Sequence, residues 1–68
     1  MKINFLGGGN MANALIGGLI QQGFTPEHIG VIEPNPENRA QLAARYGVTV
    51  YASAEAADWA VSVVFLAV

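Results

Sequence analysis

Gly7-Gly8-Gly9-Asn10-Met11-Ala12 is the stretch of this sequence that decides its fold. It follows a short, mostly apolar run, Ile3 to Leu6, which is typical of a β-strand. After it, residues 10–22 carry apolar side chains at helical spacing, and Gly23 supplies a stop signal. A strand, a glycine-rich turn and an amphipathic helix in this order predict the opening of a βαβ unit.

The rest of the chain continues the alternation of strands and helices. The sequence predicts strands over residues 29–33, 48–51 and 61–68, a helix from Asn35-Pro36-Glu37 to Tyr46, and a short helix from Ser53 to Ala60. The order β-α-β-α-β-α-β predicts an α/β fold, a Rossmann-like parallel sheet with right-handed crossovers. The run Val63-Val64-Phe65-Leu66 is apolar throughout, so we expect this strand to be buried on both faces.

Size and composition indicate part of a domain. The chain has 68 residues, of which 53% are hydrophobic and only 12% charged. We therefore expect some apolar surface to be covered by further chain or by a partner subunit. Because the sequence stops at a predicted core strand, we interpret residues 1–68 as the N-terminal part of a dinucleotide-binding domain, with any second domain absent from this chain.

Charge and residue usage exclude several classes of partner. The net charge is −2 with three basic residues, which excludes a nucleic-acid interface. There is no cysteine, so disulfides and thiolate metal sites are excluded, and no metal site is expected. The apolar runs are too short to span a bilayer and the N-terminus does not resemble a signal peptide, so a cytoplasmic location without a membrane partner is the expectation.

The glycine stretch matches the pattern Gly-Xaa-Gly-Xaa-Xaa-Gly/Ala, in which each small residue has a physical role. Gly7 permits the tight turn, Gly9 lets the backbone approach a pyrophosphate, and Ala12 allows close packing of helix on strand. The helix N-terminus would direct N–H groups at the phosphates. Glu33 lies 33 − 12 = 21 residues after Ala12, near the ~20 expected for a ribose ligand. No Gly-Lys-Ser/Thr follows, so the turn is not a P-loop.

The residues after the second strand leave the choice of cofactor open. Glu33 favours NAD, because a carboxylate accepts the ribose hydroxyls and repels a 2′-phosphate. Asn35 and Arg39 could instead surround a 2′-phosphate if Glu33 turns away. On the first interpretation, Glu33→Ser should improve NADPH binding relative to NADH. Ser53 follows the third strand, where it could cap a helix and also face the nicotinamide side.

Other residues have expected structural roles. His28, the single histidine, lies in a turn at the end of the second strand away from the cofactor and is expected at the surface. Trp59 is expected in the core or at a subunit contact. Gly17 and Gly18 lie inside the first helix, where each costs roughly 1 kcal/mol relative to Ala. We expect close packing against the sheet or another helix to compensate.

The stretch Phe5-Leu6-Gly7-Gly8-Gly9-Asn10-Met11-Ala12-Asn13-Ala14-Leu15-Ile16-Gly17-Gly18-Leu19 strongly resembles the opening of pyrroline-5-carboxylate reductases. The Gly-Asn-Met-Ala segment followed by a Gly-Gly pair is far more specific than the bare glycine pattern. The run Val63-Val64-Phe65-Leu66-Ala67-Val68 resembles the fourth strand of that family, where Lys-Pro normally follows. The resemblance covers essentially the whole chain.

This resemblance implies reduction of the C=N bond of 1-pyrroline-5-carboxylate to L-proline with NAD(P)H, the last step of proline biosynthesis. It implies NADPH as the usual cofactor, a helical C-terminal domain that binds substrate and forms the oligomer, and no activity for residues 1–68 alone. Members often carry Asn near Ser53 and a smaller or hydroxyl residue near Glu33. The cofactor contacts expected here, from pattern and resemblance together, are Gly7, Gly8, Gly9, Asn10, Met11, Ala12, Glu33, Pro34, Asn35, Arg39, Ser53, Ala67 and Val68. Catalytic residues are not identified.

Two alternatives share the same architecture. One is another dehydrogenase, of the β-hydroxyacid or prephenate dehydrogenase type, although Asn10-Met11-Ala12 and the Gly17-Gly18 pair favour the reductase. The other is a non-catalytic domain that senses a nucleotide.

Overall fold

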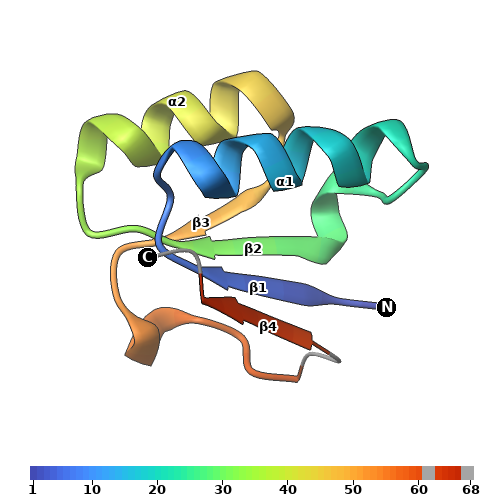
Figure 1. Ribbon diagram of the computed structural model, residues 1–68. Helices are drawn as coiled ribbons and strands as arrows, with labels where there is room; N and C mark the ends of the chain where they lie inside the picture. Colours follow the sequence, from blue (N-terminus) through green and yellow to red (C-terminus); the bar gives the residue numbers. More distant parts are fainter. Residues whose placement is uncertain (61–62, 67–68) are drawn as a thin grey trace.

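The computed structural model of the protein describes residues 1–60 and 63–66, and it confirms the α/β fold. Its elements are β1 (Ile3–Leu6), α1 (Asn10–Gln21), β2 (Ile29–Ile32), α2 (Pro36–Tyr46), β3 (Thr49–Tyr51) and β4 (Val63–Leu66), with single 3₁₀ turns at Pro26–His28 and Ala54–Ala56. The strands form one sheet in the order β3-β2-β1-β4, and every neighbouring pair is parallel. Both α-helices lie on one face of this sheet (Figure 1).

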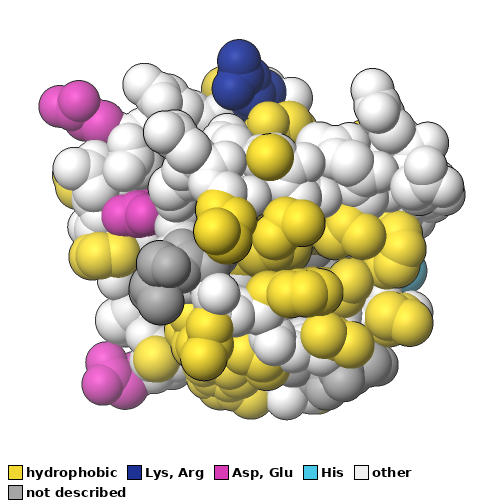
Figure 2. Space-filling view, in the orientation of Figure 1, with side chains coloured by type: hydrophobic (Ala, Val, Ile, Leu, Met, Phe, Trp, Pro, Cys, Tyr) yellow, Lys and Arg dark blue, Asp and Glu magenta, His cyan; other side chains and the backbone are white. Residues whose placement is uncertain are grey.

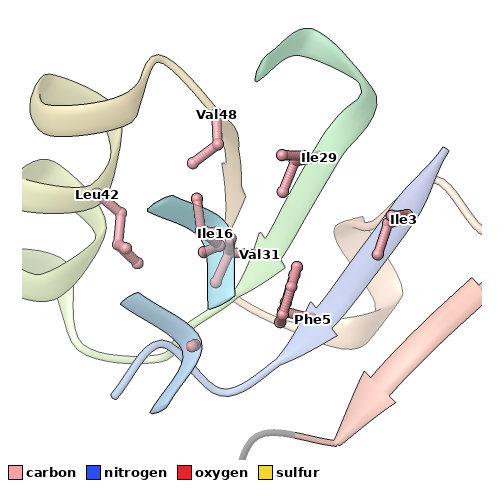
Figure 3. Close-up of a cluster of buried hydrophobic side chains, with 8 residues drawn as sticks. Ile3, Phe5, Ile16, Ile29, Val31, Leu42 and Val48 are labelled. Atoms are coloured by element: carbon pink, nitrogen blue, oxygen red, sulfur yellow. The ribbon is translucent and has the colours of Figure 1, made fainter. Parts of the chain in front are cut away.

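The hydrophobic core lies between that face of the sheet and the two helices (Figure 3). Phe5 and Val31 come from the two central strands, Ile16 from α1 and Leu42 from α2, and all four are almost fully buried. Phe5 also stacks on Phe65 of β4, with ring centroids 5.2 Å apart. The sheet is thus held to its helices through the residues that the strand and helix periods predicted.

Local sequence signals account for both ends of α2. The Asn35 side chain accepts a hydrogen bond from the Asn38 N–H at 3.0 Å, and Pro36 occupies the first helical position. Gly47 ends the helix in the left-handed region, with φ of 72°, where a side chain would be strained. The predicted start and stop of this helix are therefore confirmed.

The predicted helix from Ser53 to Ala60 is wrong. Only the 3₁₀ turn Ala54–Ala56 forms, and the Ser53 side chain makes no capping bond. Side-chain bonds take the place of the helical ladder in the following residues. Asp58 accepts from the Ala60 N–H at 2.9 Å, and the Trp59 indole donates to the Ala54 carbonyl at 2.8 Å. Trp59 is 45% exposed, so of the two positions expected for it the core is wrong, and a subunit contact stays a prediction.

The expectation that β4 is buried on both faces is wrong as well. Val64, Phe65 and Leu66 are all exposed, Leu66 to 70%. In the described part of the chain β4 pairs only with β1 and lies at the edge of the sheet, while α1 covers the sheet further in. The predicted ends of this strand, residues 61, 62, 67 and 68, lie outside the described residues.

The wide apolar face predicted for α1 is only partly buried. Ala12 and Ile16 are fully covered by the sheet, whereas Met11 and Leu15 are exposed to 61% and 42%. Figure 2 shows hydrophobic side chains gathered across this side of the molecule, over α1 and β4. The helix therefore presents one apolar stripe to the core and a second one to an open face.

The two glycines inside α1 differ in their surroundings. A Cβ on Gly17 would lie 3.7 Å from the Tyr46 ring, an ordinary van der Waals distance, so Gly17 lies beside α2 but the predicted close packing does not require a glycine there. A Cβ on Gly18 would meet nothing within 4 Å, so the same prediction is wrong for Gly18 in this structure. Gly18 instead lines the open apolar groove between α1 and β4.

Candidate functional site

The carboxyl ends of the four strands gather at one edge of the molecule, on the left of Figure 1. Gly7 follows β1, Glu33 follows β2, and Ser53 lies shortly after β3. Strand β1 lies between β2 and β4, so the chain order reverses there. In open parallel sheets, the crevice outside such a reversal point is where ligands bind.

The glycine-rich loop is shaped by its three glycines in different ways. Gly7 has φ of 101°, which only glycine adopts readily, and its N–H donates to the Ile32 carbonyl at 3.0 Å. Gly8 is buried, and a Cβ there would lie 2.8 Å from Leu42 and 3.0 Å from Glu33. Gly9 has ordinary dihedral angles, yet a Cβ on it would meet nothing within 4 Å. The first two glycines are thus required by the fold, and the third faces open space.

Helix α1 begins directly at this open space. Gly9 is its N-cap, so no side chain caps the helix, and its first turn carries no acidic residue. In contrast, α2 is capped by Asn35 and has Glu37 in its first turn. The first N–H groups of an uncapped helix, together with its dipole, favour an anion at that end. The arrangement fits the pyrophosphate of a dinucleotide.

Asn13, in the first turns of α1, is a residue of this site that the sequence reasoning missed. Its side-chain amide donates to the Gly8 carbonyl at 3.3 Å and to the Gly9 carbonyl at 3.1 Å. It thereby fastens the loop to the helix that the loop opens. The signal was its spacing, because an amide four residues beyond a glycine loop lies one helical turn above it.

Glu33 is turned toward the glycine loop and is only 8% exposed. Its Oε1 accepts from the Gly8 N–H at 2.9 Å, and its Oε2 accepts from the Asn35 N–H at 2.8 Å. The sequence spacing predicts this carboxylate as a ribose ligand. In the structure both of its oxygens accept hydrogen bonds from backbone N–H groups of the protein.

Arg39 lies beside Glu33 at the start of α2. Its Nη1 donates to the Glu33 carbonyl at 2.8 Å and to the Pro34 carbonyl at 2.9 Å. Among the described residues, the single ion pair joins Lys2 to Asp58, so the Arg39 guanidinium has no carboxylate within ion-pair distance there. Its positive charge therefore remains available to an anion at the end of β2.

A cleft of about 540 Å³ borders the loop between the N-terminal part of α1 and α2. This volume lies within the range of roughly 300–1,000 Å³ usual for small-molecule sites. Loop and helix residues line the cleft together: Gly8, Gly9, Asn10, Asn13, Asn38, Gln41, Leu42, Ala44 and Arg45. Of the cofactor contacts expected from the sequence, Gly8, Gly9 and Asn10 are in this lining.

The remaining predicted residues occupy varied positions. Ala12 is buried against the sheet, as its small size predicted, whereas Met11 points away from the core. Ser53 is half-buried, and Ala67 and Val68 lie outside the described residues. His28 is exposed at the start of β2, as expected, at the opposite end of that strand from Glu33.

Two further findings concern the described residues alone. Among residues 1–60 and 63–66, no three His, Cys, Asp or Glu side chains lie close enough together to hold a metal ion. Over the same positions, no helix combines the length and the apolar character needed to cross a membrane.

Comparison with known proteins agrees with the fold. The chain is 38% identical over 68 residues to a pyrroline-5-carboxylate reductase of Escherichia coli. The aligned part covers 98% of this chain and 25% of that protein. Reductases of the same name from Pasteurella multocida and Haemophilus influenzae are 48% and 56% identical over 76% and 60% of the chain, or 19% and 15% of their own lengths.

The resemblance to pyrroline-5-carboxylate reductases is therefore confirmed, although the chain spans no more than about a quarter of these relatives. No solved structure matches it significantly. The family model described as NADP oxidoreductase, coenzyme F420-dependent, matches residues 2–68. Since this match extends over nearly the whole chain, the protein belongs to that family of NADP-linked oxidoreductases, whose dinucleotide-binding fold it shares.

Proposed function

We propose that this chain is the cofactor-binding part of a pyrroline-5-carboxylate reductase, which reduces 1-pyrroline-5-carboxylate to L-proline with NAD(P)H as the last step of proline biosynthesis. The observation that supports it most is the uncapped start of α1 behind Gly9, next to open space at the edge where the strands end. The names of the relatives supply the substrate and the reaction.

In this proposal the residues of the chain bind and orient the cofactor. The first N–H groups of α1 receive the pyrophosphate, and Gly9 provides the room for its close approach. The bound nicotinamide supplies the hydride that reduces the C=N bond. The chain thus contributes position and electrostatics, while protonation of the imine nitrogen falls to groups outside residues 1–68.

We further propose NADPH as the preferred cofactor. Both carboxylate oxygens of Glu33 accept from backbone amides, so in this proposal the side chain stays on the loop and does not oppose a 2′-phosphate. Arg39 and Asn35 lie at the same end of β2, and the Arg39 guanidinium has no acidic partner among the described residues. A guanidinium is well suited to a phosphate. The assembly of the complete enzyme as a homo-oligomer in the cytoplasm is part of the same proposal.

The proposal is tested by a chimera in which this chain replaces the aligned 68 residues of the E. coli reductase. The chimera should reduce 1-pyrroline-5-carboxylate and consume NADPH faster than NADH. The same chimera with Gly9→Val is the matched variant, because a Cβ at Gly9 would meet no protein atom within 4 Å and the added side chain would begin in the open space at the loop. It should fold and lose activity. A folded chimera that binds neither cofactor, or an active Gly9→Val chimera, would contradict the proposal.

A further inference from the structure

The Glu33 side chain contacts the glycine-rich loop through a hydrogen bond from the Gly8 N–H. The two residues that it joins, Gly8 and Glu33, are 25 positions apart in the sequence. The other oxygen of the same carboxylate accepts a hydrogen bond from the N–H of Asn35, the N-cap residue of α2. One side chain therefore ties the loop before α1 to the loop before α2.

A carboxylate is suited to this task because it accepts at both oxygens and donates at neither. Burying an ionised carboxylate is costly unless hydrogen bonds satisfy it, and here two backbone N–H groups do so at 2.9 and 2.8 Å. Hydrogen bonds to a charged acceptor are stronger than those between neutral groups. An amide of the same shape would direct an NH₂ group at one of the two N–H donors.

The surroundings leave the carboxylate little freedom. The Glu33 N–H donates to the Tyr51 carbonyl at 2.9 Å, and the Glu33 carbonyl accepts from Arg39. A Cβ on Gly8 would lie 3.0 Å from Oε1, so the absence of a side chain at Gly8 is what admits the carboxylate. Gly8 and Glu33 thus form a matched pair.

We propose that Glu33 is a positioning residue that clamps the glycine-rich loop to the start of α2, and that it does not serve as the ribose ligand. The clamp holds the loop in the shape that receives the dinucleotide before the dinucleotide arrives. Such preorganisation increases affinity by reducing the cost of ordering. This inference rests on the proposed function, because it takes the ligand of the loop to be a dinucleotide.

The clamp and the ribose contact make opposite predictions for Glu33→Gln. Loss of the clamp should raise the Kd for NADPH and NADH by the same factor, about tenfold. Loss of a ribose ligand should weaken NADH and strengthen NADPH. Glu37→Gln is the matched control, since it makes the same chemical change at an exposed position in the first turn of α2 and should alter neither Kd. A changed NADPH-to-NADH ratio, or unchanged affinities in folded Glu33→Gln, would overturn the proposal.

Amide hydrogen exchange without any cofactor gives a second, independent readout. The Gly8 and Asn35 N–H groups should exchange slowly in the wild type and in Glu37→Gln, and markedly faster in Glu33→Gln. If Glu33→Gln does not fold, Glu33→Asp replaces it; this side chain is one methylene shorter, so at most one of the two amides should stay protected. Fast exchange of both amides in the wild type would overturn the clamp. If the wild type bound neither dinucleotide, the proposed function would fail, while the exchange rates would still decide whether the clamp exists.

Discussion

At the scale of single residues, neighbouring glycines of one loop have separate tasks. Gly8 lies against Leu42 and Glu33, both buried, while Gly9 faces open space. A sequence pattern treats these positions as one motif. The structure separates them, because a Cβ at Gly8 would collide with Leu42 and Glu33, whereas a Cβ at Gly9 would meet no protein atom within 4 Å.

Gly8→Ala should destabilise the protein, because its Cβ would lie 2.8 Å from Leu42 Cδ1, and Leu42 is only 2% exposed and cannot move aside easily. Overpacking of this kind costs about 1–3 kcal/mol. Gly9→Ala, the matched variant, places its Cβ in open space and has only the cost of a poorer N-cap, so it should lose less stability than Gly8→Ala. Urea unfolding of both variants measures the difference, and equal stabilities would contradict the assignment of separate tasks.

At the scale of elements, the two helices begin differently although each follows a strand of four residues. Helix α1 starts at a glycine and has no side-chain cap, whereas the Asn35 side chain caps α2. The helices are also joined further along, where the Tyr46 hydroxyl donates to the Asn13 carbonyl at 3.1 Å. The N-terminus of α2 is therefore satisfied by the protein's own side chain, whereas the first N–H groups of α1 have no side-chain acceptor and are free to bind a ligand.

Asn35→Ala should lower the free energy of unfolding by about 1 kcal/mol, the usual cost of removing a side-chain N-cap. Asn38→Ala is its control, since Asn38 contributes only its backbone N–H to the cap and is exposed. Denaturant titration of the two variants tests the cap. A loss in Asn38→Ala as large as that in Asn35→Ala would show that the helix depends on something other than the Asn35 side chain.

At the scale of the whole molecule, a surface contact ties the beginning of the chain to the crossover before β4. The Lys2 ammonium lies 3.4 Å from the Asp58 carboxylate, and the Asn4 amide donates to the Asp58 carbonyl at 2.8 Å. The hydrogen bond from the Ala60 N–H, and then Lys2, lower the pKa of Asp58 below 3.8. Asp58, which accepts from the Ala60 N–H within the crossover, thus also attaches the crossover to Asn4 of β1.

The lowered pKa of Asp58 makes the stability depend on acidity in a definite direction. Since the folded pKa lies below the unfolded value of 3.8, the contribution of Asp58 is present above that pH and is lost as the pH falls through the folded pKa. The wild type should exceed Asp58→Asn in stability at neutral pH, and the gap should close in acid. Lys2→Met should reduce the gap. Urea midpoints across the acid range measure it, and a gap independent of pH would refute this account.

The sequence by itself determined the order of the four strands and the two α-helices, the cap and stop of α2, and the position of the glycine loop. These follow from local properties, namely the spacing of apolar residues, the lone acceptor of an Asn and the dihedral freedom of glycine. Only the tertiary structure decided that Glu33 faces the loop, that Asn13 fastens it, and that residues 57–60 form no helix. Each of these depends on hydrogen bonds to a distant strand, a neighbouring loop or a side chain a few residues away, and spacing along the chain does not specify which donor an acceptor meets.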